Sequence, residues 1–126
     1  MALTKLFISN AIFYGYHGVA KAEKYLGGRY QVDIELWYDA ESAVTTDDIG
    51  YAINYQNVLF EVSDLMQNEH YNLIETLANE ILLTIMNKFE QIKKTRIKLR
   101  KLNAPVNHYI DFIEVEQTFD REEIGN

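Results

Sequence analysis

The alternating run from Tyr30 to Trp37 is the segment that most restricts how this chain can fold. Its even-numbered residues are all apolar or aromatic, whereas its odd-numbered residues are polar or charged until Trp37. Because successive side chains of a strand point to opposite faces, this period of two predicts a strand with one buried face and one wetter face. Trp37 falls on the wetter face, which indicates that something covers part of it, and another subunit is one candidate.

The rest of the chain divides into further strands and two long helices. Three more segments have the composition or alternation of strands, at residues 7–14, 95–101 and 109–119. Two segments carry apolar residues at helical spacing, at 55–66 after a capping Asn54 and at 73–89 after a capping Asn72. This order favours an α+β fold, a four-stranded antiparallel sheet with two helices on one face (ββααββ). Such a sheet has two open edges that need to be covered.

The connections between these elements are polar. Residues 20–26 are expected to form a polar loop between breaks at Gly18 and Gly27, and residues 45–48 a turn or the start of a short helix. Residues 119–126 are expected to form a charged, frayed tail. The chain of 126 residues is expected to be a single domain, residues 1–126.

Composition and charge exclude several classes of protein. No apolar run is long enough to cross a bilayer, and the chain does not open with a signal-peptide pattern. The absence of cysteine excludes thiol catalysis and Cys-based zinc sites, and the three histidines lack metal-ligand spacing, so no metal and no cofactor are expected. The net charge of -7 argues against nucleic acid. We therefore expect a cytoplasmic protein that binds neither membranes nor nucleic acid.

Two charged residues attract attention by their positions. Lys101 falls on the same strand face as Ile97 and Leu99, the predicted buried face, where a lysine needs a partner or a purpose. Glu75 lies in the first turn of the second predicted helix, where the helix dipole alone would favour a carboxylate. Taken singly, each residue also has an ordinary structural explanation.

Three separated segments together resemble the dihydroneopterin aldolase family. They are Tyr14–Val19 followed by Glu23, then Leu73–Ala78, then Lys101–Pro105, with Asn54-Tyr55 before the second. The resemblance covers about residues 6–115. One segment alone would be weak evidence, whereas all three segments in this order are specific to the family. The loop after Lys101 departs from the family pattern, because His108 stands at a position where relatives have glycine. The pair Lys101-Leu102 is shared with the related dihydroneopterin triphosphate epimerases.

The resemblance implies an aldehyde-lyase of folate biosynthesis that cleaves 7,8-dihydroneopterin without a metal or a Schiff base, and that can also epimerise the side chain. It implies that Lys101 and Tyr55 transfer protons, and that Glu23 receives the substrate's hydroxyl groups. Glu75 would anchor the pterin, because a carboxylate can accept two adjacent ring N–H donors. The other residues that it implies for substrate binding are Leu73, Ile74, Ile53, Asn54 and Val19.

Several of these residues have structural alternatives. Tyr55 could be an aromatic staple that packs its helix onto the sheet, Asn54 only a helix cap, and Glu23 a solvated acid. His17 is expected to be a turn or packing residue.

The resemblance also implies the tunnelling fold, in which subunits close their sheets into a β-barrel ring. The family forms tetrameric rings that stack into octamers, with each pocket between neighbouring subunits. Two other functions remain open. A dihydroneopterin triphosphate epimerase would need basic residues for the phosphates, and a non-catalytic ring protein would bind a pterin or purine without turnover.

Overall fold

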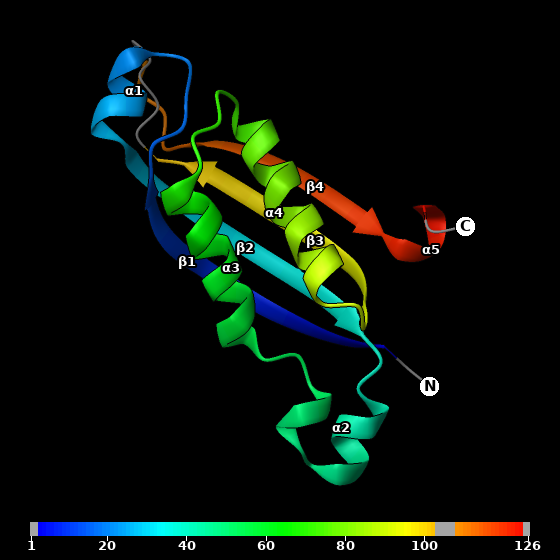
Figure 1. Ribbon diagram of the computed structural model, residues 1–126. Helices are drawn as coiled ribbons and strands as arrows, with labels where there is room; N and C mark the ends of the chain where they lie inside the picture. The colour runs from blue at the N-terminus through cyan, green and yellow to red at the C-terminus, as the bar shows by residue number, and fades with distance from the viewer. Residues whose placement is uncertain (1–2, 103–107, 125–126) are drawn as a thin grey trace.

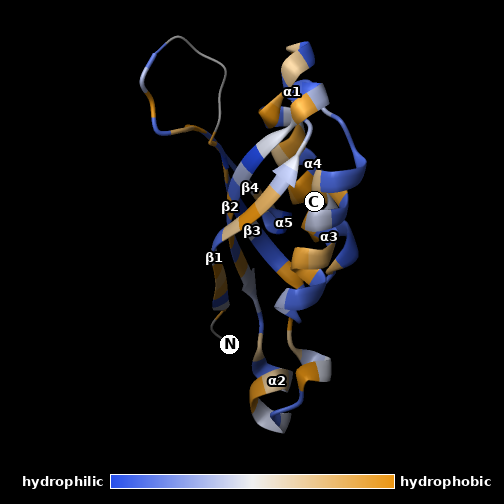
Figure 2. Cartoon of the chain, turned by 90° about the vertical axis from the view of Figure 1, so that its left-hand side faces the viewer, coloured by the Kyte–Doolittle hydropathy of each residue, from blue (hydrophilic) through white to orange (hydrophobic). Residues whose placement is uncertain are grey.

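A single antiparallel sheet in the order β1-β2-β3-β4 forms one layer of the protein. The computed structural model describes residues 3–102 and 108–124. The strands within these residues are β1 (Thr4–Gly15), β2 (Gly28–Tyr38), β3 (Ile92–Lys101) and β4 (Ile113–Asp120). Two long helices, α3 (Tyr55–Asn68) and α4 (Ile74–Lys88), form the second layer on one face of the sheet (Figure 2). This architecture confirms the predicted α+β fold.

The core lies between these two layers and follows the predicted alternation. The even-numbered side chains of β2, from Tyr30 to Tyr38, are all buried, whereas its odd-numbered side chains from Gln31 onward are only partly covered. Burying one large aliphatic side chain contributes about 1.5–3 kcal/mol, so the alternation that predicts the strand also fixes which face meets the helices. The helices contribute Val58, Val62 and Met66 from α3, and Leu77, Ala78, Ile81, Leu82, Ile85 and Met86 from α4.

The opposite face of the sheet carries a charged network around Trp37. The Lys5 and Lys94 ammonium groups lie 5.5 and 5.1 Å from the Trp37 ring centroid, and the Arg96 guanidinium carbon lies at 5.6 Å. Glu35 pairs with both Lys5 and Arg96. Cations over an aromatic face are attracted by its quadrupole. Within one chain, these long side chains already cover part of Trp37.

Short helices stand where the sequence predicts loops or turns (Figure 1). The predicted polar loop at residues 20–26 is wrong for most of its length, because Lys21–Leu26 form helix α1. Glu23 supports this helix by accepting the Ala20 backbone N–H at 3.2 Å. Residues 45–48 include the predicted turn and lead into a short helix. The α-helix α2 (Glu41–Thr46) ends at an Asp47 with a φ of 52°, and Asp48 caps the 3-10 helix η1 (Ile49–Tyr51), since its Oδ1 accepts the Gly50 N–H at 2.9 Å.

The ends of the long elements differ in part from the predicted ones. Asn54 caps α3 as predicted, since its Oδ1 accepts the Gln56 N–H at 3.0 Å. Asn72 does not cap α4, which begins after Leu73; its Oδ1 instead accepts a hydrogen bond from Lys24 Nζ at 2.5 Å. β4 begins at Ile113, four residues later than predicted.

The C-terminal segment is more ordered than a frayed tail from residue 119. β4 includes Phe119 and Asp120, and helix α5 (Arg121–Ile124) follows directly. Arg121 donates to the backbone oxygens of Ile92 at 3.0 Å and Met86 at 2.7 Å, which ties α5 to the core layers. The predicted loop around Pro105, residues 103–107, lies outside the described residues. In the part of the chain that is described, no helix has the length and apolar character to cross a membrane.

Candidate active site

The candidate site lies where the end of β3 meets α1. Lys101 is the last residue of β3, and its side chain is only 13% exposed on the helix-covered face, as the alternation predicts. It forms an ion pair with Glu23 of α1, whose side chain is also 13% exposed. Burial lowers the pKa of the Lys101 ammonium. A lysine with a lowered pKa gives up a proton more readily than a solvated one, which suits general acid–base chemistry.

His17, in the turn between β1 and α1, is buried beside this pair. Its Nδ1 accepts the Tyr71 backbone N–H at 3.1 Å, and its Nε2 lies 3.1 Å from the Met66 carbonyl oxygen. Because a backbone N–H can only donate, Nδ1 carries no proton and Nε2–H donates to Met66. Burial lowers the pKa of His17, and the nearby cationic positions of His70 and Lys101 act in the same direction. The imidazole is therefore neutral at pH 7.

The carbonyl oxygen of His17 is shared by two donors. The Tyr30 hydroxyl donates to it at 2.9 Å, and Lys101 Nζ donates at 3.4 Å. Tyr30 and Lys101 lie directly opposite each other in the β2–β3 pair. A cavity of about 10 Å³, room for about one water molecule, is lined by His17, Glu23, Gly27, Gly28, Tyr30 and Lys101.

Gly18 lets the Glu23 carboxylate approach the turn. Its φ is 145°, and a Cβ at this position would collide with the Glu23 carboxyl group. The Gly18 N–H also donates to the Tyr71 carbonyl at 2.9 Å, which binds the turn to the connection between α3 and α4. A glycine at this position is thus required both for the backbone conformation and for the place of Glu23.

The start of α4 lies at the same end of the molecule. Figure 1 shows α1, the end of β3 and the start of α4 together at the upper end. Glu75 is exposed in the first turn of α4, Leu73 is half-exposed, and Ile74 packs against the core. The predicted binding residue Val19, beside Gly18, is 73% exposed. Lys101, Glu23, Glu75 and Val19 are therefore at one end of a single chain.

The start of α3, which Asn54 caps and Tyr55 begins, lies away from this end of the molecule (Figure 1). Met66, which contacts His17, follows Tyr55 by eleven residues in the same helix. At 1.5 Å per residue, Tyr55 is about 16 Å farther along α3. Tyr55 is 53% exposed, whereas Ile53 is buried. The structure does not bring Tyr55 to Lys101 within one chain.

Two features of this cluster were not predicted from the sequence. The alternation predicts only that Tyr30 lies on the buried strand face. A buried tyrosine hydroxyl usually needs a hydrogen-bond partner, and this requirement is the signal in the sequence that points to Tyr30. The role of the His17 carbonyl oxygen as an acceptor could not be predicted, because a pattern of side chains does not show where a backbone oxygen points.

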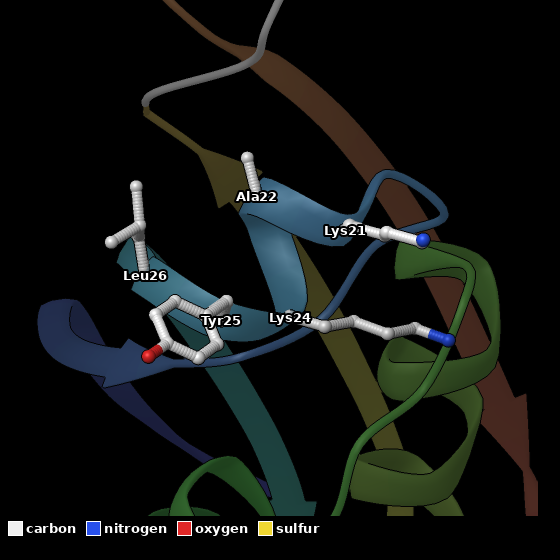
Figure 3. Close-up of a pocket in the computed structure, with 5 residues that line it drawn as sticks. All are labelled: Lys21, Ala22, Lys24, Tyr25 and Leu26. Atoms are coloured by element: carbon white, nitrogen blue, oxygen red, sulfur yellow. The ribbon is translucent and has the colours of Figure 1, made fainter.

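A second, open surface pocket of about 550 Å³ is formed by α1 alone and does not include Lys101. Figure 3 shows the side chains of Tyr25 and Leu26 pointing away from those of Lys21 and Lys24. Among the residues that the structure describes, no group of three or more His, Cys, Asp or Glu side chains is arranged to hold a metal ion.

Known proteins share both the sequence and the fold of this chain. Residues 6–118 match the family model for dihydroneopterin aldolase. The chain is 33% identical to the dihydroneopterin aldolase of Bacillus subtilis over 92% of this chain and 97% of that protein. It is 34% identical to the Streptococcus pyogenes serotype M1 enzyme, over 85% of this chain and 91% of that protein.

Solved structures of the same family superpose closely. A Vibrio cholerae chain assigned to this family matches with a TM-score of 0.86 and 25% identity, covering 96% of this chain and all of that one. The Escherichia coli dihydroneopterin aldolase, solved in complex with neopterin, matches with a TM-score of 0.83 and 22% identity, covering 92% of this chain and 98% of that one. The predicted tunnelling fold of the single chain is thereby confirmed.

Proposed function

Because the chain belongs to the dihydroneopterin aldolase family, we propose that it cleaves 7,8-dihydroneopterin into 6-hydroxymethyl-7,8-dihydropterin and glycolaldehyde. Membership of this family makes it a lyase of the folate pathway. The observation that carries the proposed mechanism is the inward-facing Lys101, paired with Glu23 beside the His17 carbonyl.

The proposed reaction is a retro-aldol cleavage of the bond between the first and second side-chain carbons. The hydroxyl on the second carbon loses its proton and becomes the aldehyde of glycolaldehyde. The electron pair of the broken bond moves into the neighbouring C=N bond of the dihydropterin, giving an enamine. Protonation of the first carbon then regenerates the C=N bond. Because the substrate supplies this electron sink, the reaction needs neither a metal nor a Schiff base with lysine.

We assign Lys101 and Glu23 to the chemistry at the side chain of the substrate. Glu23 can accept hydrogen bonds from the substrate hydroxyls, since its carboxylate is held beside Lys101. Lys101 would govern the proton at the ring nitrogen and at the hydroxyl through a water molecule, and its lowered pKa supports this role. The cavity between them has room for about one such water.

Glu75 would anchor the pterin ring. Its carboxylate is exposed in the first turn of α4, next to backbone N–H groups that have no partner inside a helix. A carboxylate can accept the paired N–H donors of the 2-aminopyrimidinone edge, and the helix N–H groups can serve the ring carbonyl. Leu73, Ile74 and Val19 would line this part of the pocket.

Tyr55 would complete a site on a neighbouring subunit. It lies about 16 Å along α3 from Met66, which touches His17, so it cannot act on the same chain's Lys101. Within the described residues, the edge strands β1 and β4 are each paired on one side only and expose Phe7, Ile12 and Ile113. Open edges of this kind favour association, and a closed ring satisfies them. We place Ile53, Asn54 and Tyr55 of one chain against Glu75 and Lys101 of the next, in tetrameric rings that stack into an octamer.

Incubation with dihydroneopterin and with its triphosphate, separately, tests the proposal. Chromatography should show 6-hydroxymethyl-7,8-dihydropterin and glycolaldehyde from the first substrate. Epimer from the triphosphate without cleavage of dihydroneopterin would make the protein an epimerase instead. Binding of both compounds without any product would make it a non-catalytic pterin-binding protein.

A further inference from the structure

We infer that His17 is a positioning residue for Lys101: its clamped imidazole fixes its own carbonyl oxygen, which holds the Lys101 ammonium and the Tyr30 hydroxyl. This inference rests on the proposed role of Lys101 in proton transfer. It assigns His17 a part in the reaction beyond packing the turn.

Both nitrogens of the imidazole are used to fix the turn. Nε2–H donates to the Met66 carbonyl near the end of α3, and Nδ1 accepts from the Tyr71 N–H in the connection to α4. The ring also stacks on Tyr71, with ring centroids 5.7 Å apart and 14° between the planes. A side chain held at both ring nitrogens and on one face has a single orientation. The backbone of residue 17 is therefore fixed relative to the end of α3 and to the connection between α3 and α4.

Gly15 provides the space that the His17 imidazole occupies. A Cβ at Gly15 would lie 2.9 Å from the His17 ring and 2.9 Å from Met66 Sδ, so only glycine leaves the imidazole its place. Tyr30 meets the ring edge-on, with centroids 5.6 Å apart. The turn from Gly15 to Gly18 is thus built around the imidazole.

The fixed carbonyl is the link to the chemistry. Tyr30 and Lys101 come from paired positions on β2 and β3 and donate to the same oxygen. The ammonium therefore lies between this oxygen and the Glu23 carboxylate. A misplacement of about 1 Å at a catalytic group can cost about 100-fold in rate. If the backbone at residue 17 becomes less rigid, the main effect should be a lower rate of proton transfer.

A double-mutant cycle separates this role from a contribution to stability alone. We expect His17→Ala to lower kcat about 10- to 100-fold. In a Lys101→Ala background, His17→Ala should lower the residual kcat by less than about threefold, because the residue that it positions is already gone. If His17 only stabilises the fold, the two losses multiply, and that result would overturn the inference.

Two more conservative variants can test the inference if His17→Ala does not fold. His17→Asn retains an acceptor for the Tyr71 N–H and should keep more activity than His17→Ala. Tyr30→Phe removes one donor to the shared carbonyl and should lower kcat several-fold with KM little changed. Its matched control is Tyr38→Phe, the same substitution on the same buried face of β2 at the far end of the strand. Equal kcat values in Tyr30→Phe and Tyr38→Phe would reject the inference.

A second control accounts for loss of stability. Thr95→Val alters a buried polar residue of β3 at the end of the strand away from Lys101 and should lower the melting temperature without a specific loss of kcat. The failure of the inference is also distinct from failure of the proposed function. An inactive parent protein would refute the function, whereas an active parent that needs Lys101 but tolerates every His17 and Tyr30 change would refute only the inference.

Discussion

Lys101 and Glu23 lie 78 positions apart in the chain and form an ion pair in which each side chain is only 13% exposed. One residue ends a central strand, and the other lies in a six-residue helix that would not be stable alone. The pair therefore exists only when the turn before α1 and the end of β3 are both in place.

Lys101→Ala should lower kcat by roughly 10²–10⁴-fold and leave pterin affinity nearly unchanged, because a general acid–base group acts on proton transfer. Stopped-flow turnover and calorimetric titration with the product pterin would measure the two effects. Lys98→Ala is the matched control, since Lys98 lies on the same strand but points to the opposite face, toward Glu116. Near-parent turnover in Lys101→Ala would remove this residue from the mechanism.

Glu75→Gln should weaken pterin binding by about 1.5–3 kcal/mol, the usual contribution of a hydrogen bond to a charged group. This corresponds to a roughly 10- to 150-fold higher Kd. The fold should persist, because Glu75 is exposed at a helix start. Glu90→Gln, an exposed acid beyond the far end of α4, should leave the Kd unchanged. An unaltered Kd in Glu75→Gln would show that the ring is anchored elsewhere.

Stability should fall as the pH drops below about 6.5, the ordinary pKa of histidine. The folded-state pKa of His17 is lowered by burial, so the unfolded chain takes up the proton first and gains stability relative to the native state. The contribution of His17 is complete above the unfolded pKa and is lost as the pH falls toward the folded one. Urea unfolding at pH 7.5 and 5.5 should show this loss.

The same pH comparison needs a variant that lacks the group. His17→Asn should be less stable at pH 7.5 but should lose less stability on going to pH 5.5 than the parent. His70 and Lys101 both oppose a positive charge on His17, so the parent's loss should be larger at low salt. An identical pH dependence in the parent and His17→Asn would assign the effect to other groups.

Dialysis against a strong chelator should leave activity intact. The sequence has no cysteine, the described residues contain no metal-ligand cluster, and the substrate's C=N bond supplies the electron sink. Initial rates before and after dialysis provide the measurement. Activity that is lost on dialysis and restored by added zinc would contradict the metal-free mechanism.

Tyr55 and Glu75 should act in the same pocket from different chains. Light scattering should give a mass several times the 14.7 kDa chain, consistent with a tetramer or octamer. Inactive Tyr55→Phe and Glu75→Ala proteins, mixed after dissociation and reassembled, should regain activity through hybrid sites. Lys101→Ala mixed with Glu75→Ala should not, because the proposed pocket takes both residues from one chain, at the end of β3 and the start of α4. A fully active monomer would refute the shared pocket.

The layers of this fold could be predicted from the periodicity of apolar residues. A strand with one buried face has apolar residues at every second position, and a helix with one buried face has them three or four positions apart. The inward position of Lys101 was predicted for the same reason, from its place two residues after Leu99. Helix α1 was missed, since its formation depends on Glu23 folding back onto Ala20 and on the packing of the turn. The acceptor at His17 was missed because it belongs to the backbone.

The candidate site also depends on Gly18, although this residue contributes no side chain to it. Its φ of 145° disfavours every other residue type, and the Glu23 carboxyl group fills the space where a Cβ would stand. A substitution at Gly18 is therefore unfavourable for two reasons, the strained backbone conformation and the steric clash with the Glu23 carboxyl group. Position 18 should therefore tolerate far fewer substitutions than the exposed Ala22, four residues later.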